Sequence, residues 1–255
     1  MVIRTPLERP LKRMRDMAGF WRRRRHPELA EVFAEGGRIE ELVARQLRPD
    51  TNCLDVGCHI GSFLSLLLRH APQGKHMAFE ALPEKAERLR RKFPDVEIVQ
   101  GAVGEQPGEI TFYRDLTYSG YSGMNVQSDG HKLEEVKVRC ETLDHLVPAD
   151  RQIDFMKVDV EGAEVMVFRG ARQLIARCRP VILFECTPDG LKGAKQNAGD
   201  IYEEIRTGLG YRLQLIKDFL AGSSESLTVE AFRKSMIYPA TARNYVASPP
   251  DYKHA

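Results

Sequence analysis

The heptapeptide DVGCHIG, residues Asp55–Gly61, connects a short apolar segment to an amphipathic one. Asn52–Val56 has the length of a buried strand, and apolar residues recur at helical spacing from about Ile60 to His70. Backbone N–H groups at the start of such a helix face a ligand, and glycine lets the ligand approach the backbone. The stretch therefore predicts a strand, a ligand-binding turn and a helix; a tight turn that binds nothing is the alternative.

Similar apolar segments of strand length follow this turn along the chain. They lie at His76–Glu80, Val96–Val99, Ile153–Val158, Val181–Phe184 and Tyr211–Ile216. Amphipathic, helix-like segments separate most of them, which is typical of β-α-β units. The pattern predicts a Rossmann-like α/β fold with a doubly wound, mostly parallel sheet.

A different pattern interrupts this alternation after Gly101. Ile110–Tyr113 and Val136–Cys140 have the composition of strands and flank a Gly/Ser-rich loop at residues 118–125, so we expect a small β insertion. The loop is interpreted either as a lid that contacts the acceptor or as an ordinary surface loop. We expect a basic, partly helical N-terminal extension at residues 1–48, one main domain at 49–240 and a C-terminal tail at 241–255.

Charge is nearly balanced over the whole chain but concentrated at its start. The formal net charge is +2, which argues against attraction of the whole surface to nucleic acid or an anionic membrane. Residues 1–26 contain nine Lys and Arg against Glu8 and Asp16. We interpret this stretch as a solvated or partner-covered arm; a transit peptide and a contact with a phosphate-bearing ligand are alternatives.

The composition also bears on where the protein resides. No stretch approaches the roughly 20 apolar residues of a membrane span. The five cysteines are odd in number and contain no C-x-x-C pair. Cys53, Cys140 and Cys186 lie in or beside strand-like segments, which is typical of reduced core residues. We therefore expect a cytoplasmic protein.

Two acidic residues, Asp55 and Glu80, indicate which kind of ligand the glycine turn binds. The spacing Asp-x-Gly-x-x-x-Gly differs from the Gly-x-Gly-x-x-Gly of dinucleotide sites, and a carboxylate at Asp55 suits a cofactor with a cationic amino-acid end. Glu80 closes the second expected strand about twenty residues later, where a carboxylate hydrogen-bonds a ribose diol. Together they predict a nucleoside pocket.

A third signal, KVDVEGAE at Lys157–Glu164, follows the expected fourth strand. The C-terminal ends of parallel strands meet at one crevice, so Asp159 is best placed to approach both cofactor and acceptor. Glu161 and Glu164 have an alternative role as first-turn residues that stabilise a helix dipole. Lys157 must pair with a carboxylate or lie at the rim, because a buried unpaired ammonium is too costly.

These motifs, taken in order, resemble those of the FkbM-type methyltransferases, a branch of the class I S-adenosylmethionine-dependent enzymes. The resemblance covers roughly residues 50–190 and rests on Leu54–Gly57, Gly61, Phe79–Glu80, Gly101–Gly104, Thr142–Asp144, Lys157–Glu164, Gly170–Ala171 and Pro180–Glu185. Lys157–Glu164 is its most specific part. The sequence departs from the family at Cys58 and His59, where Ala and Asn are usual, and at Ala81, where the proline is delayed to Pro83.

The resemblance implies a methyltransferase domain at 49–240 that binds S-adenosylmethionine. The expected cofactor-binding residues are Asp55, Gly57, Cys58, His59, Gly61, Glu80, Ala81, Ala102 and Asp159. It also implies O-methylation of a hydroxyl on a sugar, a glycoconjugate precursor or a secondary metabolite.

A hydroxyl needs a base or a metal ion to become a good nucleophile. Asp159 is our first candidate for either role, and Glu161 and His131 complete the predicted catalytic set. His145 lies in the region expected to cover the acceptor and is a further candidate. Glu185, at the end of the fifth strand, is predicted to bind Mg²⁺ together with Asp159.

The expected partner is thus a small-molecule or glycan hydroxyl acceptor, and nucleic acid is disfavoured as a partner. Assembly into a homo-oligomer is an open alternative. One alternative is a protein or nucleic-acid methyltransferase; the Asn/Asp-Pro-Pro-aromatic element of many amine-modifying enzymes is replaced here by Asp159–Gly162. The other is a catalytically degenerate, cofactor-binding partner module.

Overall fold

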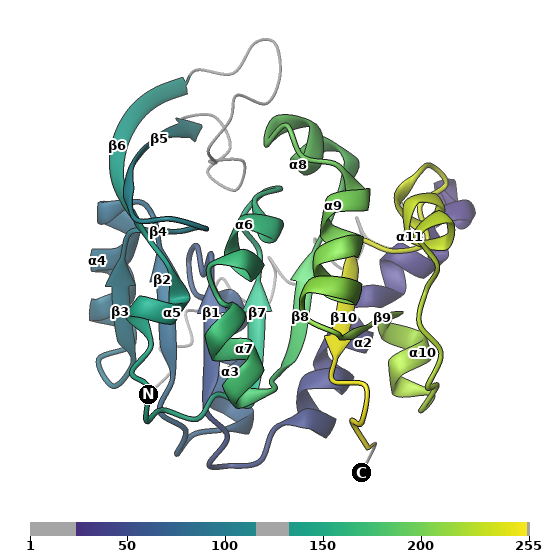
Figure 1. Cartoon of the computed structure of the whole chain (residues 1–255), viewed down its shortest axis with the longest axis horizontal. Coiled ribbons are helices and arrows are strands. Elements are labelled where there is room, and N and C mark those ends of the chain that lie inside the picture. Colours follow the sequence, from purple (N-terminus) through teal and green to yellow (C-terminus); the bar gives the residue numbers. More distant parts are fainter. Residues whose placement is uncertain (1–23, 116–132, 254–255) are drawn as a thin grey trace.

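The structure is a computed structural model that describes residues 24–115 and 133–253. Within them the main sheet has seven strands in the order β3-β2-β1-β7-β8-β10-β9 (Figure 1). Their bounds are Cys53–Val56 (β1), Met77–Glu80 (β2), Glu97–Gln100 (β3), Phe155–Val158 (β7), Val181–Glu185 (β8), Arg212–Leu215 (β9) and Asn244–Ser248 (β10). All neighbours pair in parallel except β10, which is antiparallel to both β8 and β9. The prediction of a doubly wound, mostly parallel sheet is confirmed.

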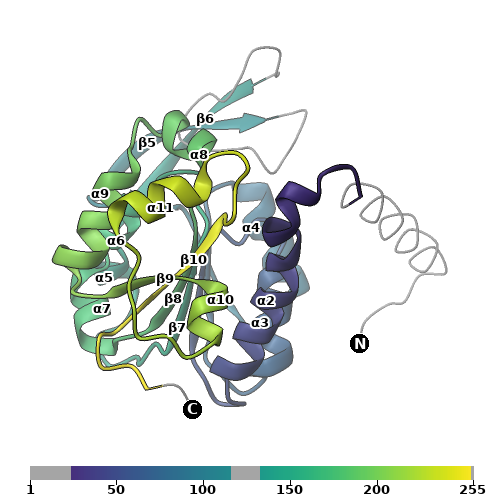
Figure 2. The same ribbon diagram turned by 90° about the vertical axis from the view of Figure 1, so that its right-hand side faces the viewer.

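Helices cover both faces of this sheet (Figure 2). One face carries α2 (Ala30–Gln46), α3 (Ser62–His70), α4 (Pro83–Lys92) and α10 (Ile216–Leu220). The other carries α5 (Leu143–Leu146), α6 (Glu164–Arg169), α7 (Arg172–Cys178), α9 (Ala198–Glu203) and α11 (Val229–Met236). Each set buries its apolar residues in a separate core cluster against the strands. The described chain also contains the short segments η1 (Pro27–Leu29), α8 (Pro188–Gly193) and the π-helical η3 (Glu204–Gly208).

The sheet extends into the expected C-terminal tail, which corrects that expectation for residues 244–248. They form β10, and Tyr245, Val246 and Ala247 are fully buried between β8 and β9. A strand of five residues that is covered on both faces has no alternating pattern, so no distinctive signal marks it in the sequence.

The N-terminal helix α2 belongs to the same core. Leu42 and Val43 are fully buried in the cluster on its face of the sheet. The carboxylate of Glu35 accepts hydrogen bonds from the backbone N–H groups of Arg243 (2.8 Å) and Asn244 (3.0 Å). The helix expected in residues 1–48 is thus tied to the start of β10 rather than held apart as an extension.

The expected β insertion is present as a second sheet. Its strands are β4 (Ala102–Val103), β5 (Gly108–Asp115) and β6 (Leu133–Glu141), in the order β4-β6-β5. β5 and β6 pair antiparallel from Gly108 opposite Cys140 to Asp115 opposite Leu133. This sheet extends over the C-terminal ends of the main strands (Figure 1). The Gly/Ser-rich loop, for which a lid is one interpretation, lies outside the described residues.

Two further expectations concern cysteines and membrane spans. All five cysteines fall within the described residues, where they are buried and form no disulfide. None of the helices in residues 24–115 and 133–253 has the length and the apolar character needed to cross a bilayer.

Candidate active site

The glycine turn is shaped by contacts with neighbouring protein segments. The N–H groups of Gly57 and Cys58 both donate to the carbonyl of Phe79, at 3.0 and 3.1 Å. Gly57 has φ +83°, and a Cβ atom there would lie 1.8 Å from the carbonyl oxygen of Asp159. Gly57 therefore lets the end of β1 pass against the end of β7, which places the turn beside Asp159.

Gly61 has a similar structural role at the other end of the turn. It is left-handed, with φ +75°, and precedes the first residue of α3. A Cβ atom would lie 2.4 Å from the ring of Phe93 and 2.8 Å from Leu89 of α4. Gly61 does not line either cavity described below, so its predicted cofactor contact stays a prediction.

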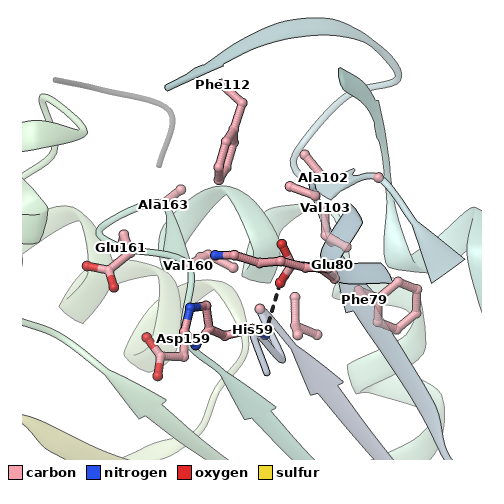
Figure 3. A pocket seen from close by; sticks show the side chains of 15 residues that line it. His59, Phe79, Glu80, Ala102, Val103, Phe112, Asp159, Val160, Glu161 and Ala163 are labelled. Carbon is pink, nitrogen blue, oxygen red and sulfur yellow. Dashed lines mark hydrogen bonds between the residues drawn. The ribbon is translucent and has the colours of Figure 1, made fainter. Parts of the chain in front are cut away.

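The turn opens into a cavity of about 270 Å³, here called the main cavity. The ends of β1, β2 and β7 and the segment that leads into β4 supply its walls (Figure 3). Seven predicted residues line it: Gly57, His59, Glu80, Ala81, Ala102, Asp159 and Glu161. Residues separated by about 100 positions in the sequence thus meet in one place, as the crevice rule requires.

A smaller cavity of about 190 Å³, the side cavity, adjoins the main one. It shares Gly57, His59 and Asp159 with the main cavity and is also lined by Asp55 and Cys58. Every predicted cofactor-binding residue except Gly61 therefore lines one of the two spaces. Their contacts with a cofactor stay predictions.

Glu80 connects the glycine turn to β2. Its Oε2 accepts the backbone N–H of His59 at 2.9 Å (Figure 3), and its Oε1 accepts the N–H of Leu82 at 3.0 Å. Burial raises the pKa of Glu80, while these hydrogen bonds and Lys85 act in the opposite direction. The carboxylate is thereby fixed in orientation at the wall of the main cavity.

Asp55 brings a buried carboxyl group to the side cavity. Only 1% of the residue is exposed, and its Oδ2 has no hydrogen-bond partner among the described residues. Burial raises its pKa to about 7, although Lys157 on the adjacent strand acts in the opposite direction. An unsatisfied carboxylate oxygen in such a place favours a cationic ligand group.

Lys157 is paired with Asp159, as the sequence requires of a buried ammonium. Its Nζ lies 3.1 Å from Asp159 Oδ2 and donates to the carbonyl of Val158 at 3.2 Å. Burial alone would raise the pKa of Asp159, but Lys157 and a hydrogen bond with Glu185 outweigh it and lower the pKa. Asp159 is therefore held as a carboxylate.

Glu185 is hydrogen-bonded to Asp159, and the protonation states of the two groups depend on each other. Burial, followed by the negative charge of Asp159, raises the pKa of Glu185 well above that of an ordinary glutamate. Glu185 is consequently a neutral acid near pH 7 and donates its hydrogen bond to Asp159. Two carboxyl groups and one ammonium thus form a compact unit at the ends of β7 and β8.

Glu161 is partly buried and lines the main cavity together with Asp159. It has φ +55°, a backbone conformation that is uncommon for residues other than glycine. Burial, Asp159 and Glu164 raise its pKa to about 7. Glu161 and Asp159 lie on the same side of the main cavity (Figure 3). A half-buried carboxyl group with this pKa can take up a proton close to neutral pH.

Glu164 holds the turn that carries Glu161. Its Oε1 accepts the N–H groups of Val160 and Gly162, both at 3.1 Å. Only 1% of the residue is exposed, and burial raises its pKa to about 7 in spite of these bonds. Its position in the first turn of α6 agrees with the helix-dipole interpretation, but the hydrogen bonds show a second role in fixing the turn.

The two predicted metal ligands, Asp159 and Glu185, come together with a third carboxyl group, that of Glu161. One oxygen of each of Asp159, Glu161 and Glu185 lies within 4.8 Å of the other two, so the three form a group that could bind a cation. Such an oxygen-rich set has the chemistry that Mg²⁺ requires. The ammonium of Lys157 already supplies positive charge beside Asp159, however. A bound Mg²⁺ stays a prediction.

The candidate histidines are less closely tied to this site. His131 lies outside the described residues. His145 pairs with Glu141 at 3.0 Å, has a side chain that is 70% exposed, and lines another hollow, which shares Gly101 and Ala102 with the main cavity. Its position gives it no contact with the main cavity.

Several residues that line the main cavity were missed by sequence reasoning. Lys85 reaches it from α4. Phe112 reaches it from β5 of the inserted sheet (Figure 3). Neither residue belongs to a motif, and both come from segments whose position only the fold determines. The strand-like composition of Ile110–Tyr113 was the one available signal for Phe112.

Comparison with known proteins identifies the family. The model of the FkbM methyltransferase domain matches residues 55–213. The 2-O-methyltransferase NoeI of Sinorhizobium fredii NGR234 is 26% identical over 173 residues, which cover 58% of this chain and 71% of NoeI. The AMB antimetabolite synthetase AmbE of Pseudomonas aeruginosa PAO1 is 24% identical over 239 residues. That match covers 76% of this chain but only 11% of AmbE, so the chain spans about a tenth of that protein.

The fold has a counterpart among solved structures. The methyltransferase FkbM of Methylobacillus flagellatus KT matches with a TM-score of 0.51 at 14% identity, over 79% of this chain and 44% of that chain. This likeness concerns the fold alone. The family model covers more than half of the chain, and its range contains the glycine turn, Glu80 and the Lys157–Glu164 segment. The chain belongs to the FkbM methyltransferase domain family.

Proposed function

We propose that the protein is an S-adenosylmethionine-dependent O-methyltransferase that acts on a hydroxyl of a sugar, a glycoconjugate precursor or a secondary metabolite. The observation that carries this proposal is that Asp159 and Glu161 line the main cavity, Asp159 also lines the adjoining side cavity, and Glu185 has a carboxyl oxygen within 4.8 Å of both residues. The cavities offer room for a cofactor, and the carboxyl groups offer a destination for a hydroxyl proton.

The residues present fit the cofactor. Glu80 presents a fixed carboxylate suited to a ribose diol, and the unpartnered Oδ2 of Asp55 suits the ammonium of an amino-acid end. S-adenosylmethionine would supply a methyl group on a sulfonium, activated for transfer. Lys157 holds Asp159 in its ionised form where both cavities meet, so Asp159 can position the cofactor and the acceptor.

Glu161 is the base that we assign to the reaction. With S-adenosylmethionine bound, the acceptor oxygen would form a bond to the methyl carbon as the carbon–sulfur bond breaks, and the hydroxyl proton would move to a carboxylate of this chain. Asp159 is held ionised by Lys157 and is a weak base, while Glu185 already carries a proton. Glu161 has the pKa that suits proton uptake near pH 7. Glu161 thus replaces Asp159, the first candidate from the sequence, as the proposed base.

The acceptor class is supported by chemistry and by one relative. Carboxyl groups accept hydrogen bonds from neighbouring hydroxyls, and NoeI, which shares 26% identity with this chain, is named a 2-O-methyltransferase. A protein acceptor, a nucleic-acid acceptor and a degenerate partner module are not favoured by a specific contact of the described residues.

A methyl-transfer assay tests the proposal. The purified protein is incubated with methyl-labelled S-adenosylmethionine and a panel of sugars, sugar phosphates and polyketide-like alcohols, with Mg²⁺ or with EDTA. We expect transfer to an oxygen of at least one hydroxyl acceptor, identified by mass spectrometry. Transfer only to nitrogen, to protein or to nucleic acid would contradict the assignment. Loss of transfer in EDTA with rescue by Mg²⁺ would support the predicted metal site.

A further inference from the structure

A hollow of about 750 Å³, here called the basic hollow, lies beside the main cavity over the exposed side of α4. Its walls come from α4 and from the glycine turn, and they include Ile60 and the polar residues His59, Lys85, Arg88, Arg91 and Lys92. His59 and Lys85 also line the main cavity. The two spaces therefore adjoin, and one elongated ligand could extend from one into the other.

The described lining of the basic hollow is cationic. Lys85, Arg88, Arg91 and Lys92 contribute four positive charges, and no acidic residue among those described lines it. Arg91 has a carboxylate neighbour in Glu87, at 3.4 Å. Both side chains of that pair are about two-thirds exposed, so water screens the interaction and leaves Arg91 able to bind an anion.

The hollow is also connected to the glycine turn. The ammonium of Lys92 donates to the carbonyl of Ile60 at 3.1 Å, which ties the end of α4 to the turn. Ile60 is 52% exposed and is one of few large apolar residues on the described surface. An apolar side chain among cations fits an anion that is carried on an organic group.

The charge of the hollow selects the class of anion. A phosphoryl group carries about two negative charges and three acceptor oxygens, and guanidinium groups bind it through two parallel hydrogen bonds. A single carboxylate has one charge and matches the four cations less well. We propose that the basic hollow binds a phosphoryl group, and that this group is carried by the methyl acceptor. The second part rests on the proposed function, whereas the first does not.

Calorimetric titration with inorganic pyrophosphate, in the absence of cofactor, tests the site. The test variant is Arg88→Ala/Arg91→Ala, and the matched control is Arg233→Ala/Lys234→Ala, which removes two exposed cations from α11 at the opposite end of the sheet (Figure 1). We expect saturable binding to the wild type and to the control, and at least tenfold weaker binding to the test variant. All three proteins keep the basic residues 1–26, so any binding by that stretch is common to them.

Absence of saturable binding to the wild type, or equal affinity in all three proteins, would overturn the proposal. Equal thermal melting temperatures will show that the exposed arginines were removed without unfolding α4. Because no cofactor is present, this result is independent of whether methyl transfer occurs.

Vesicles distinguish the source of the phosphoryl group. If a lipid headgroup supplies it, the test variant will also lose binding to phosphatidylcholine vesicles that contain phosphatidylglycerol, while the control keeps it. If a soluble ester supplies it, the three proteins will not differ on vesicles, and only the pyrophosphate titration will separate them.

Discussion

Lys157 Nζ lies 3.1 Å from Asp159 Oδ2 at the end of β7, with a lysine side chain that is 6% exposed. The ammonium keeps Asp159 ionised, and Asp159 in turn keeps the proton on Glu185. Near neutral pH, Asp159 thus stays ionised and Glu185 stays protonated. Of the three carboxyl groups at the site, Glu161 is the one that can exchange a proton.

Removal of the lysine charge will destabilise the fold. Lys157→Met leaves Asp159 without its buried counter-ion, and we expect the free energy of unfolding to fall by about 3 kcal/mol, as for a broken buried pair. Urea denaturation measures it. The control, Lys192→Met, replaces an exposed lysine of α8 and should change stability by less than about 0.5 kcal/mol. Equal effects of the two substitutions would show that the pair adds nothing to stability.

Glu161→Gln tests the assigned base. We expect kcat to fall by roughly 10²- to 10⁴-fold with little change in cofactor affinity, because the amide keeps the size of the side chain but takes up no proton. In the wild type, kcat should rise with pH through about 7, since the carboxylate is the active form. The variant should lack this rise. Glu203→Gln, at an exposed position of α9, should keep the wild-type profile; an unchanged profile in Glu161→Gln would remove Glu161 from the mechanism.

Glu80→Ala tests the nucleoside contact. Loss of a charged hydrogen-bonding group should weaken S-adenosylmethionine binding by roughly 1 to 3 kcal/mol. The backbone N–H groups of His59 and Leu82 also lose their acceptor, which adds to the effect. Calorimetry compares this variant with Glu109→Ala, an exposed position of β5. Equal affinities would contradict the contact.

A pair of glycine substitutions separates backbone strain from steric contact. Gly57→Ala and Gly210→Ala both place a side chain at positive φ, +83° and +68°, but only Gly57 has the Asp159 carbonyl within 1.8 Å of the new Cβ. We expect Gly210→Ala to reduce stability by about 1 to 2 kcal/mol from φ strain. Gly57→Ala should reduce it by about 3 kcal/mol or more and abolish cofactor binding. Similar losses in stability would mean that the close approach of β1 and β7 is easily relaxed.

The carboxyl groups with raised pKa give stability a pH dependence. Burial raises the pKa of Glu164 to about 7, so between its unfolded pKa and about 7 the folded state binds more protons than the unfolded state. The stability contributed by Glu164 is therefore present at low pH and is lost as pH rises toward 7. Measured by urea denaturation, the stability of the wild type relative to Glu164→Gln should decrease from about pH 5 to about pH 7.5 and then stay constant. A difference that does not change with pH would contradict the raised pKa.

Local patterns made much of the site predictable. Asp55–Gly61, Glu80 and Lys157–Glu164 each follow or close a buried strand, and the crevice rule brings their side chains together at one edge of a parallel sheet. A carboxylate partner for Lys157 was one of the two placements that the sequence allowed, the other being a position at the rim, because a buried unpaired ammonium is too costly.

Other features depended on tertiary contacts that no local pattern reports. β10 is a short strand buried on both sides, and its backbone neighbours include Glu35 of α2, about 200 residues earlier. Phe112 reaches the main cavity only because the inserted sheet extends over the strand ends. The need for glycine at position 57 was predictable, but its cause, contact with the Asp159 carbonyl, was not.

Calorimetric titration of the wild type with S-adenosylmethionine and S-adenosylhomocysteine tests the central claim most directly. We expect binding of both at a stoichiometry of one per chain, with micromolar dissociation constants, and weaker binding below about pH 7 as Asp55 becomes protonated. Absence of binding between pH 6 and pH 9, with or without Mg²⁺, would contradict the claim that the two cavities hold this cofactor.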